Sequence, residues 1–134
     1  MVAETHDTHH PLGPSLYYED QKPAARRRAK AFRTERMGEF LDWFEATLAR
    51  NPTHSGWLAG RRCTYADLSL YQLVEGWTYA FPKAMRKLMP HYPLVAAVHA
   101  RVPERPRLAA YLASDRRLPF NESGIFRHYP ELDG

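Results

Sequence analysis

The sequence predicts an all-α fold, a single helical bundle of about five helices around a buried central helix. Proline and glycine divide the chain into pieces of helical length, and no piece alternates apolar and polar residues as a half-buried strand does. The piece between Thr64 and Pro82 contains only two charged residues, Asp67 and Glu75. A helix that is apolar nearly all round belongs at the centre of a bundle.

The individual helices are predicted from their apolar period and from the prolines that bound them. The first long helix is expected to open at Pro23, since proline suits the first helical position, and to stop at Asn51 and Pro52. Its apolar stripe consists of Phe32, Met37, Phe40, Leu41, Phe44 and Leu48. The central helix has a stripe of Ala66, Leu70, Leu73, Val74, Trp77 and Phe81. Two shorter helices are predicted from Pro93 and Pro106, and the tail, residues 115–134, is expected to pack down.

Length and cysteine content favour one cytoplasmic domain. A chain of 134 residues is long enough to bury an ordinary core. Its single cysteine, Cys63, permits no internal disulfide and suits a reducing compartment. The start, MVAETHDTHH, lacks the pattern of a signal peptide, and no apolar run approaches the roughly 18 residues of a membrane span. We therefore expect a cytoplasmic protein with no membrane partner.

The basic residues are concentrated in one stretch. The chain has 19 Lys and Arg against 15 Asp and Glu, which gives a net charge of +4. Six of the basic residues lie in RRRAKAFRTER, namely Arg26, Arg27, Arg28, Lys30, Arg33 and Arg36. Acidic residues soon follow on the outer side, and the stretch has no series of aromatic residues that would form a stacking platform for bases. These features favour a solvated helix face over a nucleic-acid partner.

A capping box marks the start of the central helix. The hydroxyl of Thr64 can accept a hydrogen bond from the amide of Asp67, while the Asp67 carboxylate reaches back to the amide of Thr64. The aspartate side chain is shorter than that of the usual glutamate or glutamine, which suits a buried and rigid helix end. We expect Thr64 and Asp67 to have a structural role and not a catalytic one.

The segment HDTHHPLGPSLYYEDQ, residues 6–21, gathers histidine near the start of the chain. His6, His9 and His10 have helical spacing, so the three imidazoles can share a face. Together with Asp7 they can bind zinc in principle. Proline and glycine interrupt the helix directly afterwards, however, and no distant partner ligand is evident. The sequence therefore predicts no metal site.

Two stretches resemble the C-terminal helical domain of glutathione S-transferases of the sigma- or pi-like classes. GWLAGRRCTYADLSLYQLVEG contains the family's W-L-x-G loop and the T-x-x-D capping box of its buried core helix, and PRLAAYLAS matches its ending, P-x-L-x-x-Y-L-x-S. The resemblance implies one domain over residues 1–134, with 1–22 as the end of a first helix and 115–134 as a packed tail. In that family a thioredoxin-like domain comes first. This chain shows none of its strands, so we expect a detached or truncated half.

The resemblance also implies a function, glutathione conjugation in detoxification. The helical half would shape the pocket for an apolar electrophile, and the thioredoxin-like domain would supply the group that activates the thiol, so no catalytic residue is expected here and the chain alone should be inactive. Glutathione would be a co-substrate, with no other cofactor, and the partner would be a second copy or a thioredoxin-like domain. Asp7 would touch the amino group of glutathione bound to the neighbouring subunit. The implied pocket residues are His9, Tyr17, Ser69 and Leu73.

Plainer interpretations remain open at these positions. Leu73 can be simple core, Tyr17 can pack at a helix junction, and His9 can be exposed to solvent. The whole chain can also be a non-catalytic helical module for protein–protein interaction, as in translation-associated proteins that use this fold for assembly. A broad basic face would favour that alternative, and the stretch from Arg26 to Arg36 supplies part of one.

Overall fold

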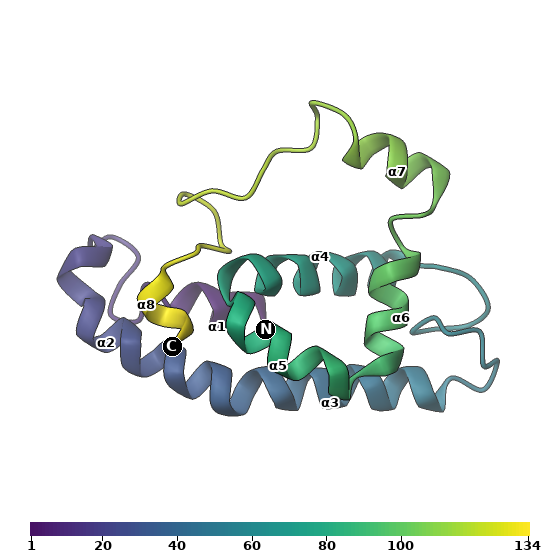
Figure 1. The fold of residues 1–134 in the computed structure, drawn as a ribbon, viewed down its shortest axis with the longest axis horizontal. Helices are drawn as coiled ribbons and strands as arrows, with labels where there is room; N and C mark the ends of the chain where they lie inside the picture. Colours follow the sequence, from purple (N-terminus) through teal and green to yellow (C-terminus); the bar gives the residue numbers. More distant parts are fainter. The chain divides into compact units, whose positions relative to one another are not determined.

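The computed structural model describes all residues, 1–134, and consists of helices and turns without a strand (Figure 1). The longer helices are α2 (Tyr18–Ala31), α3 (Met37–Arg50), α4 (Tyr65–Ala80) and α6 (Pro93–Arg101), and a π-helical segment, Phe32–Arg36, joins α2 to α3. The shorter ones are α1 (Val2–Asp7), α5 (Pro82–Leu88), α7 (Pro106–Leu112) and α8 (Pro130–Asp133), with a 3₁₀ turn at Met89–His91. The predicted all-α class is confirmed. No helix is both long enough and apolar enough to cross a membrane.

The residue contacts divide the chain into two compact units. The first unit comprises Met1–Phe40, Gly76–Leu88 and Phe120–Gly134, and the second comprises Leu41–Glu75 and Met89–Pro119. The predicted central helix, α4, contributes residues to both units. It buries Leu70, Tyr71, Leu73, Val74, Trp77 and Ala80.

The prediction that the first long helix opens at Pro23 is wrong, because α2 begins five residues earlier, at Tyr18. Pro23 lies inside the helix and costs it one backbone hydrogen bond. Tertiary contacts favour the earlier start. The ring of Tyr18 is buried and stacks on Tyr129 with the centroids 3.8 Å apart, and its hydroxyl donates to Glu131 at 3.0 Å. The gain from this burial and hydrogen bonding outweighs one missing hydrogen bond.

The turn before α2 is held by one buried side chain. Gln21 accepts a hydrogen bond from the amide of Leu12 at 3.0 Å and donates to the carbonyls of Gly13 and Leu16 at 3.2 and 3.1 Å. These bonds satisfy a buried amide and fix the path of residues 11–16. Residues 1–22 were expected to form the end of a first helix. In the structure, α1 ends at Asp7, and residues 18–22 already belong to α2.

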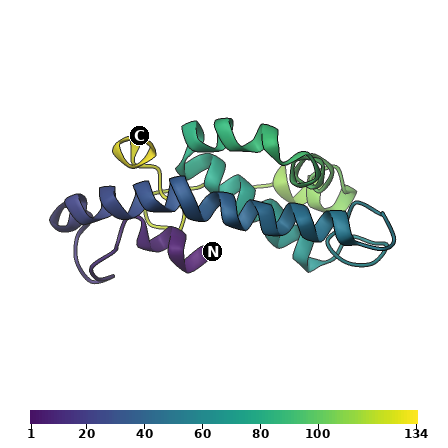
Figure 2. The same cartoon turned by 90° about the horizontal axis from the view of Figure 1, so that it is seen from below.

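The first unit packs around Trp77, which is fully buried. Phe32 meets its indole nearly edge-on, with ring centroids 5.7 Å apart. Figure 2 shows α1 beside the rod formed by α2 and the π-helical segment, and an ion pair joins them: the guanidinium of Arg36 donates to both carboxylate oxygens of Glu4, at 2.9 and 3.1 Å. These contacts hold α1 in place.

Asp133 fastens the C-terminal segment to the first unit. Its buried carboxylate accepts hydrogen bonds from the amides of Lys83 at 2.7 Å and Ala84 at 3.2 Å, in the first turn of α5. The first amides of a helix lack partners within the helix. The Asp133 carboxylate therefore caps α5, although Asp133 follows Lys83 by 50 residues in the sequence. Neither α5 nor α8 was predicted from the sequence. Pro82, expected to end the central helix, also opens the next one.

The second unit holds α6 at both ends. The carboxylate of Glu45 accepts hydrogen bonds from two amides in the first turn of α6, both at 2.9 Å. At the other end, the guanidinium of Arg101 lies 3.7 Å from the ring centroid of Trp57 and donates to the carbonyl of Gly56 at 2.7 Å. The helices predicted from Pro93 and Pro106 are α6 and α7, and both begin at these prolines.

Candidate functional site

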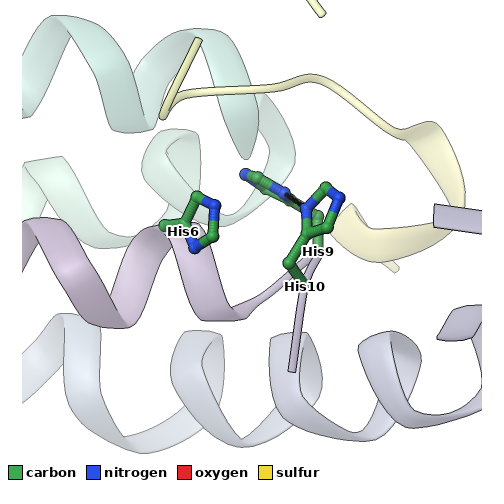
Figure 3. A group of neighbouring side chains, drawn as sticks. All are labelled: His6, His9 and His10. Carbon is green, nitrogen blue, oxygen red and sulfur yellow. Dashed lines mark hydrogen bonds between the residues drawn. The ribbon is translucent and has the colours of Figure 1, made fainter. Parts of the chain in front are cut away.

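Three histidine side chains gather where α1 ends (Figure 3). The amides of His9 and His10 both donate to the carbonyl of His6, at 3.1 and 3.2 Å, so the helical turn continues beyond Asp7. The ring centroids are 5.0 Å apart for His6 and His9, 5.3 Å for His6 and His10, and 4.8 Å for His9 and His10. We call this trio the histidine cluster.

His9 is the most tightly held member of the cluster. It is 1% exposed, and its Nε2 donates to the carbonyl of Ile125 at 2.9 Å. A carbonyl only accepts hydrogen bonds, so this contact assigns the proton of neutral His9 to Nε2 and leaves a lone pair on Nδ1. That Nδ1 lies 2.6 Å from Nδ1 of His10. The interpretation of His9 as solvent exposed is wrong.

Burial lowers the pKa of His9 to about 4, against the opposing effect of the Ile125 hydrogen bond, and the charge of Arg127 adds to the lowering. Burial and then Arg127 also lower the pKa of His10 from its usual 6.5. Both rings therefore favour the neutral form at neutral pH, in which an imidazole nitrogen offers a lone pair. His6 is half-buried.

The two other sequence-predicted residues of the first unit are more exposed than this buried pair. Asp7 is the last residue of α1 and half-exposed, with Oδ1 3.6 Å from Nδ1 of His6. Tyr17 precedes α2 and is 81% exposed, so its phenol lies in solvent while His9 is turned inward.

The two sequence-predicted residues of the second unit, Ser69 and Leu73, both lie on α4. Ser69 is exposed, whereas Leu73 is buried, as expected of simple core. The second unit also has a cavity of about 610 Å³, lined by Leu68 and residues 105–108. Neither of these two α4 residues lines it.

Asp67 makes more contacts than the capping box predicts. Its carboxylate is completely buried and accepts hydrogen bonds from the amide of Thr64 at 2.8 Å and from the Thr64 hydroxyl at 3.1 Å. The Thr64 hydroxyl accepts from the amide of Ala66 at 3.3 Å, one residue before the predicted donor, Asp67. The amide of Leu58, in the preceding loop, donates to the other carboxylate oxygen at 2.8 Å. Asp67 therefore ties the W-L-x-G loop to the start of α4, a contact that local spacing does not reveal.

Two residues that hold the histidine cluster in place, Thr5 and Ile125, were not predicted from the sequence, because their partners are distant in the chain. Thr5 and Trp77 are joined across 72 residues, and Ile125 contacts His9 across 116. A buried tryptophan needs a partner for its N–H, and this is the one signal that could have directed attention to Thr5.

Comparison with known proteins agrees with this fold. Residues 6–115 match the family model described as glutathione S-transferase, C-terminal domain. The chain is 33% identical over 86 residues to glutathione S-transferase P 1 of Bufo bufo, an alignment covering 63% of this chain and 39% of that protein. It is 31% identical over 77 residues to glutathione S-transferase P 1 of Xenopus laevis, covering 58% of this chain and 34% of that protein. The chain belongs to the glutathione S-transferase C-terminal domain family.

Proposed function

We propose that this chain is the helical half of a glutathione S-transferase-like protein that shapes the electrophile pocket for glutathione conjugation. A thioredoxin-like domain would supply most of the glutathione site. The observation that supports this proposal is the family match over residues 6–115, which includes the buried cap of α4. The aligned parts span 39% and 34% of the two curated relatives, so conjugation by a complete protein is our proposal for this chain.

The dependence on a second domain has a chemical reason. A thiol with an ordinary pKa of about 8.5 is only a few per cent ionised at neutral pH, so a positioned donor must stabilise the thiolate. Tyr18 is poorly suited to this task, because burial and its bond to Glu131 raise the pKa of its phenol and its hydroxyl already donates to that carboxylate. Tyr17 lies in solvent. We therefore assign no catalytic residue within this chain.

The proposal takes the pocket residues that the resemblance implies for each unit by itself: exposed Tyr17 and buried His9 in the first unit, and exposed Ser69 and buried Leu73 in the second. Exposed side chains are free to meet a bound electrophile, and buried ones support the wall behind them. Asp7 is half-exposed and carries a charge suited to the amino group of glutathione bound to a partner subunit. The protein would act as a homodimer in cytoplasmic detoxification.

The test is reconstitution. The chain is joined to a thioredoxin-like domain from a pi-like glutathione transferase, and conjugation of a generic aryl halide is measured for each half and for the fusion. We expect background rates from the separate halves and a clear gain from the fusion. Turnover by the chain alone, or a folded dimeric fusion without any gain, would overturn the proposal.

Two variants of the active fusion test the pocket. Tyr17→Ala should raise the KM for a bulky electrophile, whereas Tyr65→Ala, which removes a tyrosine that is 84% exposed, should not. Asp7→Asn should raise the KM for glutathione with little change in kcat, and sedimentation velocity should show a dimer. Equal effects of the two tyrosine variants would remove Tyr17 from the pocket.

The second candidate function is a non-catalytic helical interaction module. The observation that favours it is the basic stretch, because its members in the C-terminal half of α2 are exposed: Arg26, Arg27, Arg28 and Lys30. Such a surface suits an acidic protein partner. This candidate predicts a folded fusion that never exceeds background conjugation.

A further inference from the structure

The histidine cluster has the composition and the spacing of a transition-metal site. One nitrogen from each of His6, His9 and His10 can be chosen so that all three lie within 4.8 Å of one another. In a tetrahedral zinc site with bonds of about 2.0 to 2.1 Å, ligand nitrogens are about 3.3 Å apart. The two closest nitrogens, 2.6 Å apart, would separate slightly and the others would approach by at most about 1.5 Å. Side-chain rotation alone can supply movements of this size.

His9 already has the second contact that metal-bound histidines usually make. Its Nε2–H donates to the carbonyl of Ile125 at 2.9 Å, which fixes the ring and aims the free Nδ1 lone pair at His10. The one hydrogen-bond partner of His9 Nδ1 is Nδ1 of His10. The hydrogen bond between these two nitrogens can be replaced by two bonds to one ion.

His6 and its neighbours complete the arrangement. The Asp7 carboxylate lies 3.6 Å from Nδ1 of His6, so it can orient this ring and partly neutralise a cation. His6 remains 32% exposed, which leaves an entry path from solvent. The opposing charge nearby is Arg127, whose guanidinium is bonded to the carbonyl of Gly124 at 2.8 Å.

We propose that His6, His9 and His10 bind one divalent transition-metal ion of the zinc type, with water in the fourth position. Three imidazoles suit Zn²⁺, Ni²⁺ or Cu²⁺ and do not suit Mg²⁺ or Ca²⁺, which prefer oxygen ligands. All three ligands lie within residues 6–10, and the hydrogen bond from His9 to the carbonyl of Ile125 would link the bound ion to that segment. The metal site shares His9 and Asp7 with the proposed conjugation site, so its test uses metal binding by the chain alone and not conjugation activity.

The test uses the full chain purified without a polyhistidine tag. Isothermal titration with ZnCl₂ should show one ion per chain, Co²⁺ should give the visible absorption of a tetrahedral site, and excess Mg²⁺ should not compete. The two ligands other than fully buried His9 give usable variants: His6→Ala and His10→Ala should each weaken Zn²⁺ binding at least about tenfold. His91→Ala is the matched control, because His91 is an exposed histidine outside the cluster.

A second measurement separates loss of the site from loss of the fold. Circular dichroism should show the same helix content in all variants, and Zn²⁺ should raise the unfolding temperature of the wild-type protein and of His91→Ala but not of His10→Ala. Binding of less than one equivalent, competition by Mg²⁺, or equal weakening by His91→Ala would overturn the proposal.

Discussion

The indole Nε1 of Trp77 donates a 2.8 Å hydrogen bond to the hydroxyl of Thr5, which lies 72 residues earlier in the chain. Both residues are buried, and the Thr5 hydroxyl donates in turn to the carbonyl of Met1 at 3.0 Å. The bond fastens α1, and with it the histidine cluster, to the end of α4 that belongs to the first unit.

Replacing Thr5 tests this attachment. Thr5→Val keeps the shape of the side chain but leaves the buried indole N–H without its acceptor, so it should lower the free energy of unfolding by about 1 to 3 kcal/mol. Urea denaturation followed by circular dichroism measures the change. Thr47→Val, which removes an exposed hydroxyl bonded to the carbonyl of Trp43, is the control and should change stability little. If Thr5→Val lowered the free energy of unfolding by the same amount in a Trp77→Phe background as in the wild type, the pairing of these two side chains would be contradicted.

Asp67→Ala should be more costly, because it removes the acceptor for two backbone amides at once. The amides of Leu58 and Thr64 each lose a 2.8 Å bond to a completely buried carboxylate. We expect a loss of about 2 to 4 kcal/mol by chemical denaturation, and a smaller loss for Asp67→Asn, which retains one acceptor. Asp115→Ala, at an exposed position, is the control. A change near zero for Asp67→Ala would rule out the buried cap.

Gly76 should resist a substitution that usually stabilises a helix. An alanine Cβ at this position of α4 would lie 2.4 to 2.5 Å from ring atoms of Phe126. Glycine to alanine inside a helix ordinarily gains up to about 1 kcal/mol, but this clash should turn the change into a loss of about 1 to 2 kcal/mol. Thermal unfolding measures the sign. Gly124→Ala, where Cβ meets nothing closer than 3.8 Å, is the control, and Phe126→Leu should relieve the Gly76→Ala clash.

The ion pair between Glu4 and Arg36 predicts a dependence on pH. Its hydrogen bonds hold the pKa of Glu4 below the usual 4.5, so its stabilisation is present above about pH 4.5 and is lost as the pH falls through the lower, folded-state pKa. Because both side chains are partly exposed, Glu4→Gln should cost only about 0.5 to 1 kcal/mol at pH 7.

Urea titrations at pH 7, 5 and 3 check this window. The difference in free energy of unfolding between the wild type and Glu4→Gln should shrink towards zero at pH 3. It should also be smaller in high salt. Glu122→Gln, at an exposed position, is the control for general effects of charge removal. A difference that grows on acidification would show that Glu4 is not stabilised in its charged form.

Sequence alone determined the features that depend on near neighbours. The all-α class, the helices that start at Pro93 and Pro106, and the amide of Thr64 bonded to Asp67 all follow from spacings of four residues or fewer and from the fixed backbone of proline. The family could also be inferred, because its motifs are local. The roles of Asp7, Tyr17, Ser69 and Leu73 at a glutathione or electrophile site stay predictions.

Tertiary structure decided the start of α2, the burial of His9 and the cap of α5. In each of these, a side chain meets a partner about 50 or more residues away: Tyr18 meets Glu131, His9 meets Ile125, and Asp133 meets Lys83. Helical spacing allowed the three histidines to share a face, but only the hydrogen bond from His9 to Ile125 fixes the orientation of the His9 ring. A periodic pattern specifies which side of a helix is apolar, whereas burial and the pairing of buried polar groups depend on which distant segment covers that side.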